Sequence, residues 1–186
     1  MDAAPEPITL RHSQAVWVPI VVWAMCALAV GDAFIEGTLG YALRIVVLVA
    51  AVAYVVYIAL ARPSLEVDAD GITITNVLHT NRIPFGALTD LRVGGLTSAF
   101  ARTAEGAERK ITSWNAPGVP RRLPQQANAH PTGESQVERV VNERWDRWKV
   151  ANPQDSGQSV LIRRWNSREL AIAGALIVLN IAIRLR

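Results

Sequence analysis

The sequence lacks the cysteine pairs and histidine clusters that form disulfides or metal sites. Its one cysteine, Cys26, lies in an apolar run, so the chain has neither a disulfide framework nor a cysteine-based metal motif. The three histidines, His12, His79 and His130, are far apart, and none stands at metal-ligand spacing or beside a nucleophile motif. We therefore expect no enzyme activity, no catalytic residue, no metal and no cofactor.

Charged residues are also scarce, at 19% of a chain that is 51% hydrophobic. The 19 basic residues are mixed with 16 acidic ones, and the net charge is only +3. Nucleic-acid-binding surfaces need clustered Lys and Arg, so we expect no nucleic acid partner. A length of 186 residues leaves room for one globular domain plus membrane segments, which argues against a large two-domain enzyme.

The sequence contains long apolar runs with few charged residues. Residues 15–30 contain no charged side chain, and residues 41–61 contain only Arg44. A helix that crosses about 30 Å of hydrocarbon needs about 20 residues, which the second run supplies and the first supplies if it continues to Ile35. The prediction is a transmembrane hairpin at residues 15–61, with helices at about 15–35 and 41–61, after an N-terminal tail at residues 1–14.

A cleaved secretory signal is the alternative interpretation of the first run. Signal peptides begin with a strongly basic segment, but here Asp2 and Glu6 offset Arg11. No clean cleavage site of small residues precedes a mature domain. The transmembrane interpretation is therefore preferred.

The charges that flank the two runs predict their orientation. The link at residues 31–40 carries Asp32 and Glu36 and no basic residue, whereas Arg62 follows the second run directly. The positive-inside rule places the tip of the hairpin outside, and the N-terminus and the following domain in the cytoplasm. We expect a multi-pass protein of the cell membrane. Within the second run, Arg44 is near one end, where it can snorkel or pair with Asp32 or Glu36.

A third apolar run occupies residues 170–183 near the C-terminus and is interrupted only by Asn180. At 1.5 Å per residue it extends about 21 Å as a helix, which is short for a bilayer. We predict a linker at residues 152–168 and then a third apolar helix at 169–186. Spanning is preferred to the alternative, an interfacial or buried helix packed against the hairpin.

Between the membrane runs the pattern changes to short β-strands. Residues 65–67 and 72–75 alternate apolar and polar side chains on either side of the turn at 68–71, which predicts a hairpin. Further strands are predicted at residues 82–85, 91–93, 99–103 and 109–114, with a turn at 104–107. Closely spaced short strands indicate a small barrel or sandwich. Four prolines at residues 115–134 then predict a loop.

One amphipathic helix is predicted at residues 135–150. Ser135 and Glu138 have capping-box spacing, which satisfies the first amide groups of a helix. Four apolar residues then recur at helical spacing: Val137, Val141, Trp145 and Trp148. We interpret this face, including both tryptophans, as packing that closes the barrel rather than as a ligand-stacking site.

Four motifs occur in a recognisable order. Arg62-Pro63 ends the hairpin, Asp70-Gly71 forms a turn, and Arg82-Ile83-Pro84-Phe85 and a strand pair ending at Trp114 follow. In this order, the region from about 42 to 150 resembles the bacterial PH-like domain of the low-molecular-weight protein antigen family of actinobacteria. The resemblance implies a bent, seven-stranded antiparallel barrel closed by a C-terminal helix, although only about six strands can be counted.

The predicted fold class is therefore an α+β membrane protein. A transmembrane helical hairpin precedes a PH-like antiparallel β-barrel or sandwich at residues 62–151, which is capped by a C-terminal helix and followed by the third apolar helix. PH folds commonly bind phosphoinositides through basic residues in the first hairpin loop, but the loop at 68–71 is acidic here. The remaining candidate lipid-facing or interaction residues are Arg82, Arg102, Arg109, Lys110, Arg163, Arg164 and Arg168.

Two functions of different classes follow from these residues. The preferred hypothesis is a membrane-anchored PH-like module that acts in protein interaction or scaffolding at the bacterial membrane, with the bilayer and an unidentified protein as partners. The alternative is a peripheral module that senses anionic lipid. A transporter or channel subunit would need facing polar residues in the membrane, and Arg44 with Asn180 is thin support. A homo-oligomer formed through the hairpin is left open.

Overall fold

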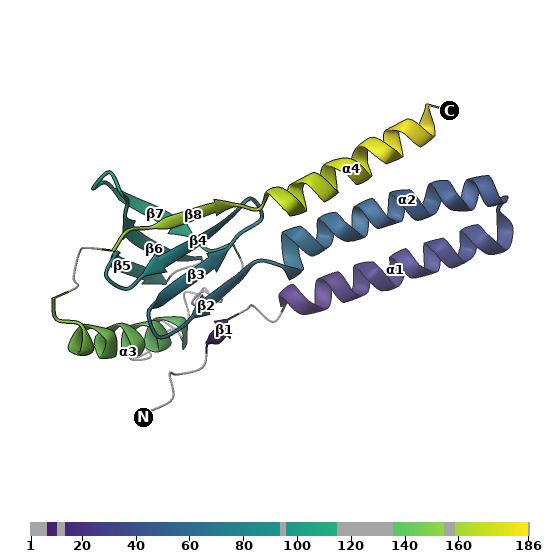
Figure 1. The fold of residues 1–186 in the computed structure, drawn as a ribbon. Helices are drawn as coiled ribbons and strands as arrows, with labels where there is room; N and C mark the ends of the chain where they lie inside the picture. Colours follow the sequence, from purple (N-terminus) through teal and green to yellow (C-terminus); the bar gives the residue numbers. More distant parts are fainter. Residues whose placement is uncertain (1–6, 11–13, 94–95, 115–135, 155–158, 186) are drawn as a thin grey trace, which may run out of the picture. The chain divides into compact units, whose positions relative to one another are not determined.

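The computed structural model describes residues 7–10, 14–93, 96–114, 136–154 and 159–185. The chain forms two compact units: Met1–His12 with Pro63–Arg164, and Ser13–Arg62 with Trp165–Arg186. The first is the β unit and the second the helical unit (Figure 1). The predicted Pro-rich loop and the capping residue Ser135 lie outside the described residues.

The helical unit confirms the predicted hairpin of two long helices. It consists of α1 (Gln14–Glu36), α2 (Leu39–Val56), the π-helix η1 (Tyr57–Ala61) and α4 (Ser167–Arg184). The segments Trp17–Ile35 and Leu39–Ala61 are long and apolar enough to cross a membrane. Thr38 caps α2, and its Oγ1 accepts a hydrogen bond from Tyr41 N at 3.4 Å.

The link between α1 and α2 is shorter than the predicted residues 31–40. Helix α1 continues through Asp32 as far as Glu36, so only Gly37 and Thr38 connect the helices. Arg44 is exposed and makes no ion pair with Asp32, both of which belong to the described part of the chain. The alternative of pairing with Asp32 is therefore not observed, and the side chain of Glu36 lies outside what the structure describes. Snorkelling remains the preferred interpretation of Arg44.

The prediction that the last helix is apolar is wrong. Helix α4 includes Arg168 and Glu169 in its first turn and Arg184 in its last. Of the described helices, α1 and α2 with η1 each contain a segment that is long and apolar enough to cross a membrane, and α4 does not. It packs against α2, and Arg62 Nη2 lies 3.1 Å from Glu169 Oε1. The charged first turn of α4 is thus tied to the end of η1.

The β unit contains two antiparallel sheets (Figure 1). One has the order β1-β2-β3-β4-β8, with strands Ile8–Leu10, Ser64–Val67, Gly71–Thr75, His79–Pro84 and Ile162–Trp165. The other has the order β5-β6-β7, with strands Leu88–Val93, Thr97–Arg102 and Glu108–Thr112. All six predicted strands are present, and the first hairpin pairs Val67 with Ile72.

Of the eight strands in the described residues, β1 and β8 were not predicted. Strand β1 lies in the predicted tail and pairs Leu10 with Leu65, and β8 lies in the predicted linker beside β4. They are three and four residues long, too short to show a recognisable alternation. The β unit therefore incorporates chain from before the helical hairpin and from directly before α4.

The core lies between the sheets and α3 (Gln136–Ala151). Val137 and Val141 are fully buried, and Trp145 and Trp148 pack against the core while remaining partly exposed. The rings of Phe85 and Trp148 are tilted, with centroids 6.2 Å apart. The predicted packing role of this helix face is confirmed.

Candidate functional site

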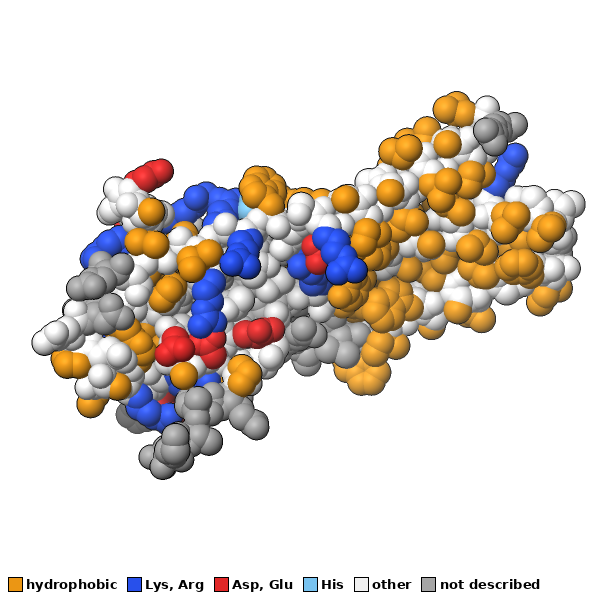
Figure 2. Space-filling model, in the orientation of Figure 1, with side chains coloured by type: hydrophobic (Ala, Val, Ile, Leu, Met, Phe, Trp, Pro, Cys, Tyr) orange, Lys and Arg blue, Asp and Glu red, His pale blue; other side chains and the backbone are white. Residues whose placement is uncertain are grey.

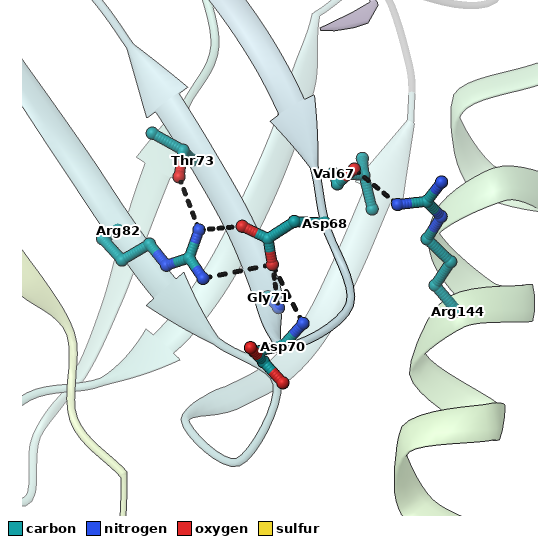
Figure 3. A network of polar contacts seen from close by, with 7 residues as sticks. All are labelled: Val67, Asp68, Asp70, Gly71, Thr73, Arg82 and Arg144. Atoms are coloured by element: carbon teal, nitrogen blue, oxygen red, sulfur yellow. Dashed lines mark hydrogen bonds and ion pairs between the residues drawn. The ribbon is translucent and has the colours of Figure 1, made fainter. Parts of the chain in front are cut away.

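The first β-hairpin is closed by a polar network around Asp68 (Figure 3). Asp68 Oδ1 accepts hydrogen bonds from the backbone N–H groups of Asp70 and Gly71, each at 2.9 Å. Arg82 donates to both carboxylate oxygens of Asp68, and its Nη1 also donates to Thr73 Oγ1 at 3.1 Å. Arg82 therefore stabilises the hairpin, and its guanidinium is committed to Asp68 and Thr73.

A second arginine connects α3 to the same hairpin (Figure 3). Arg144 is only 8% exposed, and its Nη1 donates a hydrogen bond of 2.7 Å to the backbone oxygen of Val67. A buried guanidinium is tolerated only where its donors find acceptors. Arg144 is consequently part of the fold, and it holds the capping helix to the end of β2.

The hydrogen bonds also determine the pKa of Asp68. Partial burial raises the pKa, but the hydrogen bonds from Arg82, Asp70 and Gly71 and the positive charge of Arg82 outweigh it. The pKa of Asp68 therefore lies below its ordinary value of 3.8. The loop stays anionic at neutral pH and does not provide the basic grip of a phosphoinositide site at this hairpin.

Replacement of Asp68 by asparagine should destabilise the β unit in a pH-dependent way. Because the folded pKa is depressed, the stabilisation is complete above about pH 3.8 and is lost as the pH falls through the folded pKa. We expect Asp68→Asn to lower the free energy of unfolding by about 1 kcal/mol at pH 7, since the ion pair is partly exposed. Urea denaturation of the full-length protein at pH 7 and pH 3 measures this.

The matched control for this prediction is Asp70→Asn, which removes a neighbouring exposed carboxylate from the same loop. It should leave the stability almost unchanged at both pH values. An equal loss in both variants, or a loss that persists undiminished at pH 3, would contradict the role assigned to Asp68.

A basic cluster forms where β4, β7 and β8 approach one another. We define the basic cluster as His79, Arg109 and Arg163. Arg163 Nη2 lies 3.0 Å from Nδ1 and 2.6 Å from Nε2 of His79, although the residues are 84 positions apart. Loss of contact with water lowers the pKa of His79 below its ordinary value of 6.5, and the charges of Arg163 and Arg109 lower it further. Figure 2 shows basic side chains over the region of β7 and β8.

Asn76 positions the β3–β4 turn that leads into His79. Its side-chain Nδ2 donates to Thr112 O at 2.9 Å, and its Oδ1 accepts from Trp114 N at 3.0 Å. Its own backbone N–H donates to His79 O at 2.9 Å. One amide side chain thus joins the turn to the end of β7, which brings His79 towards the strand that carries Arg109.

The basic cluster lies at the end of the sheet from which the chain enters the helical unit. Ser64 pairs with Thr75, which pairs with Thr80, the neighbour of His79. Two strand spacings of about 4.8 Å place the start of β4 about 10 Å from Ser64. Ser64 is two residues beyond Arg62, so the start of β4 lies at the end of the sheet where the chain leaves η1.

The structure places the predicted candidate residues in different surroundings. Arg163 lies within hydrogen-bond distance of His79 and the charge of Arg109 acts on the same ring, whereas Arg82 is bound to Asp68. Lys110 and Arg164 follow them in β7 and β8, where successive side chains point to opposite faces of a strand. Arg102 is exposed at the end of β6, and Arg168 belongs to the helical unit.

Three residues of the site were missed by sequence reasoning. His79 was noted only as a histidine without metal-ligand spacing, and neither Asn76 nor Arg144 was singled out from the sequence. Of the three, only Asn76 had a local sequence signal for its role, because an Asn that follows a strand often forms hydrogen bonds to backbone groups of a turn. In the described residues no three His, Cys, Asp or Glu side chains are grouped so as to hold a metal ion.

Comparison with protein-family models finds a match described as Bacterial PH domain over residues 62–130. This stretch is less than half of the chain, and it contains strands β2 to β7. The match supports the predicted bacterial PH-like domain, and the antiparallel sheets with two apolar helices are consistent with it. No curated protein matches the chain, and no solved structure matches it.

Proposed function

We propose that the chain is a membrane-anchored, non-enzymatic PH-like module that acts in protein interaction or scaffolding at a bacterial membrane. The resemblance to the actinobacterial low-molecular-weight protein antigen family is part of this proposal. The observation that carries it is the apolar surface of the helical unit.

The apolar surface is too extensive for a helical unit surrounded by water (Figure 2). Only 11% of the α1 segment and 6% of the α2–η1 segment is buried, so neither resembles the core helix of a soluble protein. Soluble proteins rarely expose apolar patches above a few hundred Å². The exposed large apolar side chains include Trp17, Ile20, Val21, Trp23, Met25, Leu28, Phe34, Ile35, Leu39, Leu43, Val52 and Val55. A lipid bilayer provides the surroundings that these side chains require.

Strand pairing independently supports a hairpin that enters and leaves on one side. Strand β1 precedes α1, strand β2 follows η1, and the two pair through Leu10 and Leu65. Both ends of the hairpin must therefore lie on the side that holds the β unit. The acidic residue Asp32 near the tip and Arg62 at the base favour the cytoplasm for that side.

Interaction with protein is favoured by the open edges of the two sheets. Strand β8 is exposed at all four positions and occupies one edge of its sheet, and β7 is exposed at its first three positions and occupies an edge of the other. Edge strands offer backbone groups to which an extended peptide can add. The exposed face of α3 is a further surface for a partner.

Cysteine labelling in intact cells tests the membrane anchoring and its orientation. In a Cys26→Ala background we would place single cysteines at Gly40, Glu105 and Leu185. Gly40 has no atom within 4 Å of an added Cβ, whereas a Cβ at Gly37 would lie 2.5 Å from Ala33 O and strain the turn. An impermeant maleimide should label Gly40→Cys in intact cells and Glu105→Cys only after permeabilisation.

The remaining labelling outcomes are equally specific. Labelling of Leu185→Cys from outside would show that α4 spans the membrane despite its charged first turn. Labelling of Glu105→Cys in intact cells would contradict the cytoplasmic orientation. Extraction of the protein by alkaline carbonate would contradict anchoring altogether, and the cysteine-free parent controls for background labelling.

Sensing of anionic lipid is the second candidate function, and the basic cluster favours it. The two candidates differ in their response to salt, because ionic strength screens charge-based contacts far more than strand addition or apolar contacts. Scaffolding predicts a partner that co-purifies in detergent and remains bound at high salt. Lipid sensing predicts that binding to anionic lipid is weakened by salt.

A further inference from the structure

The basic cluster places positive charge on three strands at one point of the surface. Arg163 is exposed in β8, Arg109 is exposed in β7, and both lower the pKa of His79 in β4. Within the described residues, Arg109 lies within 4 Å of no acidic side chain. Like charges held close together raise the free energy of the folded state, and an anion bound between them relieves that repulsion.

The side chains have the chemistry needed to hold a phosphate. Guanidinium groups present several donors in a planar fork and commonly bind phosphate oxygens in pairs. The ring of His79 adds a donor and, when protonated, a further positive charge. Arg109 lies within the stretch that matches the bacterial PH domain and Arg163 lies beyond its end, so the set is formed by tertiary structure rather than by one loop.

The position of the basic cluster along the chain selects a membrane lipid as the source of that phosphate. Arg163 is four residues before Ser167, the first residue of α4, and the start of β4 is two strands from Ser64 at the exit of η1. Trp165 lies between Arg163 and α4 in the sequence and is 66% exposed, and tryptophan is enriched at membrane interfaces. Basic groups near an anionic leaflet are attracted to it.

We propose that His79, Arg109 and Arg163 bind the phosphate of an anionic lipid headgroup in the leaflet that the protein's own helices enter. This inference rests on the proposed membrane anchoring and adds a ligand class and a site to it. The site differs from the first hairpin loop, where Arg82 is bound to Asp68 and the loop is acidic.

The test follows His79 by NMR in the full-length protein. A His12→Gln/His130→Gln background leaves His79 as the only histidine, so its ring signals are unambiguous. The protein is held in zwitterionic micelles and titrated with dihexanoyl phosphatidylglycerol or, as a neutral reference, dihexanoyl phosphatidylcholine. We expect a saturable shift with the anionic lipid alone and a rise in the pKa of His79, because a bound phosphate favours the protonated ring.

Matched variants separate a site from general attraction. Arg109→Gln should weaken the apparent affinity about tenfold, since it removes charged hydrogen bonds to the phosphate. Arg109→Lys keeps the charge without the fork and should give a smaller loss. Lys110→Gln removes the same charge one residue away on the opposite face of β7 and should change the affinity less than about threefold. Both positions are exposed, and circular dichroism verifies the fold of the three variants.

Four results would overturn the proposal. They are the absence of saturation, equal losses in Arg109→Gln and Lys110→Gln, equally tight binding of glycerol 3-phosphate, and saturation by a hexaglutamate peptide but not by lipid. The last result would assign the basic cluster to an acidic protein partner. Because the titration is done in micelles, its failure is distinguishable from a failure of the labelling that tests membrane anchoring.

Discussion

Replacement of Gly71 by alanine is expected to destabilise the β unit by about 3 kcal/mol or more. An added Cβ would lie 2.3 Å from Ile83 O and 2.8 Å from the Cα of Pro84, and both neighbours are backbone atoms. Since backbone cannot move aside as a flexible side chain can, β3 and β4 must separate where Gly71 faces Pro84. That separation also threatens the adjacent hydrogen bond from Phe85 N to Asp70 O, which is 2.8 Å long.

Urea denaturation of the full-length protein, followed by near-ultraviolet circular dichroism, measures the effect of Gly71→Ala. The graded control is Gly106→Ala in the β6–β7 turn, where φ is +79° and nothing lies within 4 Å of the added Cβ. That variant carries only the cost of a left-handed conformation, about 1 kcal/mol. A loss at Gly71 no larger than the loss at Gly106 would contradict the close approach of the strands.

Removal of the Phe85 ring is expected to lower the free energy of unfolding by about 3–5 kcal/mol, because a large buried side chain leaves a cavity. Phe85 is 1% exposed, directly follows β4 and packs against Trp148 of α3. The expected loss therefore includes the contact between the capping helix and the first sheet. In the folded Phe85→Ala protein, before urea unfolds it, the fluorescence of Trp148 should also change.

The matched control for Phe85 is Phe100→Ala in β6. Phe100 is only partly buried, and its ring lies beneath the Arg92 guanidinium, with 4.7 Å between Cζ and the ring centroid. The same substitution there should cost about 1 kcal/mol, from lost surface packing and the cation–π contact. Similar losses in the two variants would show that the core does not lie where Phe85, Val137 and Val141 place it.

Arginine has two roles in this fold: some arginines stabilise the β unit, and others belong to the exposed basic cluster. Arg82 and Arg144 donate hydrogen bonds to groups of the β unit itself, at Asp68, Thr73 and Val67. Arg109 is exposed, and its charge lowers the pKa of His79, the residue that Arg163 contacts. A ligand is therefore better sought at the start of β4 than at the first hairpin loop.

The proposed lipid site and the proposed protein interaction both concern the surface of the β unit. A headgroup bound by the basic cluster would hold the β4 and β8 end of the sheet at the leaflet, while the exposed face of α3 would stay available to a protein. Loss of lipid binding in Arg109→Gln with an unchanged partner would show that the two functions are separable. Joint loss would show that the partner recognises the lipid-bound module.

The sequence by itself determined the helical hairpin, the six strands of residues 64–112 and the packing face of α3. Each depends on a local pattern: an apolar run of sufficient length, alternation on either side of a turn, or apolar residues at helical spacing. The order of these patterns was also sufficient to indicate a bacterial PH-like domain, which the family match over residues 62–130 supports.

Tertiary structure alone decided which short segments became strands and which distant residues came into contact. Strands β1 and β8 are too short for a local signal and form because β2 and β4 offer free edges. His79 and Arg163 are 84 residues apart, and no local pattern relates them. The role of Glu169 in the first turn of α4 is evident only from the structure, where it forms an ion pair with Arg62. Local patterns fix elements, whereas contacts between distant residues depend on the complete packing of the chain.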